Sequence, residues 1–223
     1  MWCSAKRGVP LAGPRHSLKR RQDAQAVERS GLRLQLLKRQ AAAGDIVLLF
    51  GDQSEALTHP YLAHAWVRQG ADMRVNAPGQ AHKVAMLGVQ DAVTRQLIVQ
   101  TSETKRSADF IALLGRLDRE YGPQPGRRRR PVTLVLDNGP IHTSKASRAA
   151  MAARPWLTIE WLPKYAPELN DIERAWRDLK RHFLAHLTFA STDELDYTIQ
   201  QAVHAMNHER AEQHLWHDHR IAA

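Results

Sequence analysis

Two runs of mainly apolar residues, each leading into an aspartate, constrain the fold of this chain most strongly. The first spans residues 46–50 and leads through a glycine into Asp52, and the second spans residues 132–136 and leads directly into Asp137. Strands that are apolar at every position are typical of sheets whose two faces are both covered by helices. When two such strands lie side by side in one sheet, both carboxylates emerge at the same edge.

The remaining sequence pattern places these strands in an α/β fold. Further strands are expected near 73–77, 82–90, 96–100 and 157–162. Helices are expected at 23–43, 107–121, 143–153 and 171–186, and again from the cap signal at 191–194. Ser107 is expected to cap the second helix and Asn170 the fourth. This order fits a mixed five-stranded sheet flanked by helices, which is the ribonuclease H-like layout.

Positive charge is concentrated near the N-terminus. Residues 1–43 contain ten lysines and arginines and two acids, a net charge of +8, whereas the remaining 180 residues carry +1. A basic arm ahead of a nearly neutral domain suggests a polyanionic partner, because such residues bind phosphates without reading a sequence. A solvated leader would have the same composition, and charge alone does not separate the two interpretations.

Composition excludes several classes of protein. No apolar stretch approaches the roughly 18 residues of a membrane helix, and no apolar run resembles a secretory signal, so a cytoplasmic protein without membrane contact is expected. The single cysteine, Cys3, excludes an intramolecular disulfide and a thiolate-rich zinc site. The C-terminal histidines match no metal-ligand spacing and are interpreted as a solvated tail; they are His204, His208, His214, His217 and His219.

A third acid joins the two aspartates. Glu173 lies in the first turn of the helix expected at 171–186, beside its apolar stripe, and packing of that stripe on the sheet would bring it to the strand ends. Carboxylate oxygens suit Mg²⁺ or Mn²⁺, and two such ions about 4 Å apart serve both ends of a phosphodiester displacement. Taken singly, each acid is typical of a turn or of the start of a helix.

Three segments resemble the catalytic motifs of DDE transposases, most closely those of the mariner-related bacterial insertion sequences, the six-thirty class. They are FGDQS at 50–54, LDNGPIH at 136–142 and LPKYAPELNDIERAW at 162–176. The resemblance covers residues 44–210, and the third motif is the most specific. Glu173 follows Asp137 by 36 positions, and this group of transposases keeps that interval in the mid-thirties.

The resemblance implies a function and a division of the chain. Asp52 would bridge two Mg²⁺ or Mn²⁺ ions, Asp137 would bind one and Glu173 the other. The enzyme would cleave DNA at transposon ends and transfer the freed strand to target DNA, typically at TA, as a homodimer associated with the nucleoid when bound to DNA. The basic arm with its partial helix would span 1–43, the ribonuclease H-like catalytic domain 44–210 and a C-terminal tail 211–223.

Departures from the family pattern supply auxiliary candidates. Gln53 stands where the family usually has a glutamate, and Asp171 stands where it usually has a proline, which makes Asp171 a rival or auxiliary ligand. Asn138 is expected to orient Asp137 or to contact DNA. His142 is interpreted either as a contact to DNA or to a metal-bound water, or as an ordinary loop histidine.

Two groups of basic residues are candidates for binding the DNA backbone. The first group lies in a loop and consists of Arg127, Arg128, Arg129 and Arg130. The second group follows Glu173 on its helix and consists of Arg174, Arg177, Lys180 and Arg181. Each group can equally be a solvated surface.

Three functional interpretations stay open from sequence. Residues 1–43 show no pair of helices typical of the helix-turn-helix region that this group uses to read transposon ends, so a separate polypeptide is a candidate partner. An active DDE recombinase is the leading hypothesis. A non-catalytic relic that binds DNA or a partner is the alternative, and another ribonuclease H-like nuclease, such as a resolvase, is the third. The 162–176 motif favours a transposase.

Overall fold

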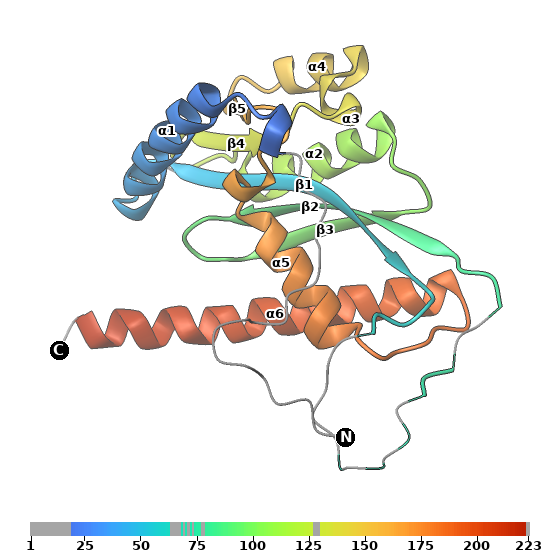
Figure 1. Cartoon of the computed structure of the whole chain (residues 1–223). Coiled ribbons are helices and arrows are strands. Elements are labelled where there is room, and N and C mark those ends of the chain that lie inside the picture. The colour runs from blue at the N-terminus through green and yellow to red at the C-terminus, as the bar shows by residue number, and fades with distance from the viewer. Residues whose placement is uncertain are drawn as a thin grey trace, which may run out of the picture.

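The computed structural model contains a mixed five-stranded sheet with helices on both faces (Figure 1). It describes residues 19–62, 68, 70, 72, 74–76, 79–126 and 130–221, with side chains up to residue 212. The strands are β1 (Val47–Leu57), β2 (Lys83–Asp91), β3 (Leu97–Ser102), β4 (Val132–Leu136) and β5 (Leu157–Trp161). Their order is β3-β2-β1-β4-β5, with β1–β4 and β4–β5 parallel and the other pairs antiparallel. The predicted five-stranded mixed sheet is confirmed.

Helices cover the two faces of the sheet with separate hydrophobic cores. The helices are α1 (Ala24–Ala42), α2 (Ser107–Tyr121), α3 (Pro140–Thr143), α4 (Lys145–Ala152), α5 (Ile172–Asp178) and α6 (Thr192–Ile221). A π turn, η3 (Leu179–Phe183), follows α5, and short 3₁₀ turns occur at η1 (Lys19–Arg21) and η2 (Pro167–Leu169). Side chains of α1, α5 and α6 pack on one face, and those of α2 and α4 on the other.

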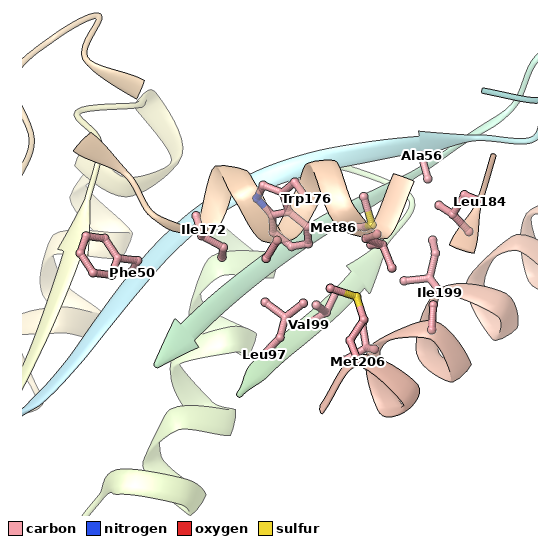
Figure 2. Packing of buried hydrophobic residues seen from close by; sticks show 14 of the residues in the cluster. Phe50, Ala56, Met86, Leu97, Val99, Ile172, Trp176, Leu184, Ile199 and Met206 are labelled. Carbon is pink, nitrogen blue, oxygen red and sulfur yellow. The ribbon is translucent and has the colours of Figure 1, made fainter. Parts of the chain in front are cut away.

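Alternation along the buried strands decides which face the acids share. Leu48 and Phe50 of β1 point to the face covered by α5, whereas Val47 and Leu49 point to the face covered by α2. Successive side chains of a strand point to opposite faces, so Asp52 lies on the α5 side. In β4 the side chains alternate in the same way, and Val135 points to the face covered by α5. Figure 2 shows Ile172 and Trp176 on α5 and Phe50 beyond the start of that helix, and all three belong to one core cluster.

A glycine lets α5 approach the sheet closely. A Cβ atom at Gly88 would lie only 2.7 Å from Cζ2 of Trp176, so the indole ring occupies the space that any larger residue would fill. Gly88 is the residue of β2 that pairs with Asp52 of β1. Because Glu173 precedes Trp176 by three residues, or about one helical turn, this contact places Glu173 near Asp52.

Two of the predicted strands differ from the structure. The strand expected near 73–77 is wrong, since residues 74–76 are not in a strand; residues 73 and 77 lie outside the described part. The first strand was expected to stop before Asp52, but β1 runs on to Leu57. Its parallel pairing with β4 ends at Phe50 and Val135, while its antiparallel pairing with β2 continues to Leu57. Long-range pairing therefore lengthens the strand beyond its apolar run.

The helix ends also depart from expectation. Ser107 is the first residue of α2 rather than its cap; Arg106 holds that position, and its backbone N–H donates to the Asp109 carboxylate at 2.8 Å. The helix expected to reach residue 186 ends its regular turns at Asp178. The predicted start of the C-terminal tail falls inside α6, which continues to Ile221. No helix in the described ranges is both long enough and apolar enough to cross a bilayer.

Candidate active site

The three predicted acids line one cleft, next to the point where the parallel pairing of β1 with β4 ends. Phe50 and Val135 are the last registered pair of these parallel strands, and Asp52 and Asp137 follow them by two residues each. Glu173 stands exposed in the first turn of α5 on the same cleft. The cleft has a volume of about 420 Å³ and is completed by residues 138–140, 162–167 and 170.

The acids share a cleft without forming a closed metal cage. Among the described residues, no three His, Cys, Asp or Glu side chains converge as a ready-made metal site. Asp52 and Asp137 are both half-buried, whereas Glu173 lies at the exposed rim. The arrangement therefore leaves room between the acids for a substrate and its counterions.

Asp52 is a half-buried acid without a lysine or arginine ion-pair partner among the described residues. Burial raises the pKa of its carboxyl to about 7, and the neighbouring carboxylates of Glu173 and Asp137 add to the increase, while the backbone N–H of Gln53 opposes it. No lysine or arginine in the described ranges forms an ion pair with Asp52. An acid in this environment is stabilised in its charged form by a bound cation.

Asp137 is held by two hydrogen bonds that its neighbours donate. The backbone N–H of Gly139 donates to Oδ1 at 3.0 Å, and Nδ1 of His142 lies 2.6 Å from the same oxygen. His142 lowers the pKa of Asp137 most, and burial partly opposes this effect. His142 is 2% exposed and packs edge-to-face on Phe110. His142 therefore lies in the interior beside Asp137, in the short helix α3 rather than in a loop.

The asparagines hold the cleft together. The side chain of Asn138 donates to the backbone oxygen of Leu162, so it ties the end of β4 to the loop that follows β5. Asn170 was expected to cap α5, but the cap position belongs to Asp171, whose side chain makes no capping bond. The buried Asn170 side chain instead donates to the backbone oxygen of Gly51 at 3.1 Å. It thereby links the third motif to the strand that carries Asp52.

Asp171 is engaged away from the other acids. Its carboxylate forms an ion pair with Nζ of Lys38 at 2.6 Å, and it does not line the cleft. Just before α1, the side chain of Gln22 donates to Glu168 at 3.0 Å and to the backbone oxygen of Tyr165, in the segment that precedes Asp171. The sequence offered no signal for these contacts, because the partners lie more than a hundred positions apart.

The candidate DNA-binding residues fall in different places. Arg177, Lys180 and Arg181 line a second cleft of about 390 Å³, which shares Glu173 with the first. Arg174 is exposed on α5. Arg130 lines a separate cleft formed by β3, α2 and α6, away from the acids. The other three arginines of that loop, Arg127, Arg128 and Arg129, lie outside the described residues, as do the side chains of His214, His217 and His219.

Gly139 is a further residue of the site that sequence reasoning did not single out. A Cβ atom at this position would lie 3.0 Å from Oδ1 and 3.3 Å from Oδ2 of Asp137. A side chain at this position would therefore crowd the carboxylate and displace it slightly. The turn-forming sequence that begins at Asn138 was a usable signal for a tight approach at this point.

A comparison with models of protein families shows to which family the chain belongs. The model of a family described as DDE superfamily endonuclease matches residues 47–196. The chain belongs to this family. The match begins at the first residue of β1 and includes all three acids of the cleft, and it confirms the family predicted from the three motifs.

Individual relatives agree with this membership. The chain is 30% identical over 132 residues to an insertion element IS630 uncharacterized 39 kDa protein of Shigella sonnei. That alignment covers 59% of this chain and 37% of the relative, so the chain spans little more than a third of that relative's length. The similarity agrees with the predicted mariner-related, six-thirty group.

Solved structures confirm the fold. The catalytic domain of Mos1 mariner transposase aligns with a TM-score of 0.56 at 19% identity, covering 91% of this chain and 96% of that one. The Mos1 mariner paired end complex with Mn aligns with a TM-score of 0.58 at 19% identity, covering 92% of this chain and 66% of that one. The predicted ribonuclease H-like fold of a DDE catalytic domain is thus confirmed.

Proposed function

We propose that this chain is the catalytic domain of a DNA transposase that cleaves DNA at transposon ends and transfers the strand to target DNA. The observation that carries the proposal is the cleft shared by Asp52, Asp137 and Glu173, in which the half-buried Asp52 forms no ion pair with a lysine or arginine that the structure describes. DDE endonuclease membership supports the same chemistry. A non-catalytic relic is disfavoured, because all three acids are present and share one cleft.

The donor set fits a hard divalent cation. The three carboxylates would hold Mg²⁺ or Mn²⁺, with two ions expected, and solved Mos1 complexes with Mn and with Mg support this choice. Bound ions of this kind supply an activated hydroxyl and stabilise the leaving oxygen of a phosphodiester. Burial raises the pKa of Asp52 most and the neighbouring carboxylates add to it, and a bound cation would favour the charged form of all three acids.

The surroundings of the acids suit a DNA backbone. Lys180 and its neighbours Arg177 and Arg181 line the second cleft, which continues from Glu173 along α5. We infer that these cations hold phosphates next to the cleaved bond. The structure of a Mos1 paired-end complex with a left transposon end supports DNA as the partner. A homodimer in the active complex, and a separate helix-turn-helix polypeptide that reads the ends, complete the proposal.

Cleavage assays with matched variants test this function. Purified protein is incubated with Mn²⁺ or Mg²⁺ and a duplex that carries the ends of its own element. We expect strand cleavage by the wild type and none by Asp137→Ala, because a proposed metal ligand is lost. Asp171→Asn is the matched control and should cleave, since Asp171 pairs with Lys38 outside the cleft. Cleavage that persists in Asp137→Ala would overturn the assignment of the acids.

A further inference from the structure

We propose that His142 is a positioning residue, which holds Asp137 so that one chosen oxygen, Oδ2, is presented to the metal ion. The inference rests on the proposed role of Asp137 as a metal ligand. It concerns a histidine that touches no substrate and acts only through the carboxylate beside it. The juxtaposition of His142, Gly139 and Asp137 carries the argument.

Both donors to Asp137 converge on a single oxygen. Oδ1 receives the Gly139 backbone N–H at 3.0 Å and faces Nδ1 of His142 at 2.6 Å. Oδ2 receives no hydrogen bond from the described residues. With two donors directed at Oδ1, Oδ2 is the oxygen whose lone pairs remain available for a cation. The protein thus distinguishes the two chemically equivalent oxygens of this ligand.

The histidine is itself fixed from several sides. Its ring centroid lies 4.7 Å from that of Phe110 of α2 in an edge-to-face arrangement. The short helix α3 that carries it is held at its start by Thr143, whose hydroxyl donates to the Gly139 backbone oxygen at 3.0 Å. Further along, the buried Ser147 hydroxyl donates to the backbone oxygen of Ile141. A ring with so little freedom can hold the carboxylate in one rotamer.

The chemistry of the contact suits this role. With its proton on Nδ1, the imidazole donates a charge-assisted hydrogen bond to the Asp137 carboxylate. Residues that hydrogen-bond to a metal ligand without touching the ion orient that ligand. Their loss typically lowers metal affinity by 10- to 100-fold. If His142 only filled space against Phe110, removing it would change the stability of the fold and leave metal affinity unaltered.

Three substitutions separate positioning from packing. Asn in His142→Asn places an amide nitrogen near the position of Nδ1, whereas His142→Gln places it near Nε2, and His142→Leu keeps bulk without a donor. Leu113→Ala is the control, because Leu113 is buried in the same core cluster as Phe110, on which His142 packs, and it is not one of the two residues that bond Asp137. Each protein is titrated with MnCl₂ alone by calorimetry, and its thermal unfolding is measured in EDTA.

We expect His142→Leu and His142→Gln to bind Mn²⁺ about 10- to 100-fold more weakly than the wild type, with His142→Asn close to the wild type. Leu113→Ala should lose stability and keep its affinity. Equal Mn²⁺ affinity in the Leu, Gln and wild-type proteins would overturn the positioning role of His142 and leave the proposed function intact. If His142→Leu does not fold, the Asn and Gln variants decide, and equal affinities of these two also overturn it. A wild type that binds no Mn²⁺ overturns the proposed function, and the inference with it.

Discussion

Replacing Asp52 by asparagine should stabilise the metal-free protein at neutral and alkaline pH. Burial raises the pKa of Asp52 from the ordinary 3.8 to about 7, so the folded protein binds a proton that the unfolded chain has already released. The stability of the wild type therefore falls as pH rises from about 4 to about 7. Each unit of pKa difference between the folded and unfolded states corresponds to about 1.4 kcal/mol. The rise from 3.8 to about 7 therefore lowers the free energy of unfolding by about 4 kcal/mol once Asp52 is fully ionised. Asp52→Asn carries no such charge.

Urea unfolding in EDTA at pH 5 and at pH 8 measures the effect. The stability difference between Asp52→Asn and the wild type should grow by about 3 kcal/mol between these two values, because ionisation is completed near pH 7. Added Mn²⁺ should then stabilise the wild type at pH 8 and leave the variant unchanged, since a ligand that binds only the folded state raises its stability.

Asp118→Asn provides the control for a generic effect of charge removal. Asp118 is a carboxylate of α2 that pairs with Arg154, away from the acids, so its removal should destabilise the protein at both pH values. A difference between Asp52→Asn and the wild type that stays constant from pH 5 to pH 8 would refute the reasoning, because it would show that Asp52 titrates normally in the fold.

Four further predictions test other parts of the structure. Mn²⁺ affinity should rise about tenfold per pH unit up to about pH 7 and then level off, since binding releases the Asp52 proton; calorimetry that finds a flat profile contradicts this. Gly88→Ala should lower the free energy of unfolding in urea by about 1–3 kcal/mol, because the methyl group collides with Trp176. Gly115→Ala is its control and should not destabilise the protein, because the space around Gly115 is open. Leu37→Ala should cost about 2–5 kcal/mol, while the exposed neighbour Leu36 tolerates alanine within about 0.5 kcal/mol; equal effects would show that α1 lies outside the core. Asn207→Ala should destabilise by about 1–3 kcal/mol, because Asn207 pairs with both backbone groups of Leu97 on the edge strand β3; an unchanged unfolding midpoint would contradict it.

Local pattern was sufficient for the parts of this protein that depend on neighbouring residues. Continuous apolar runs identified β1 and β4, and the acids that follow those runs identified Asp52 and Asp137 as candidates. The 3.6-residue stripe of the helix at 172 placed Glu173 beside its apolar face. These features are visible in sequence because burial repeats with the period of each strand or helix, within a few turns of chain.

Tertiary structure decided everything that depends on partners far apart in the chain. Pairing with β2 extends β1 past its apolar run and puts Asp52 inside a strand. Lys38 draws Asp171 away from the cleft, and α2 buries His142 against Asp137. Such contacts follow from which elements share a sheet face, and no local period records them. The sequence by itself therefore predicted which acids would lie near one another, and the fold determined which neighbours contact them in the cleft.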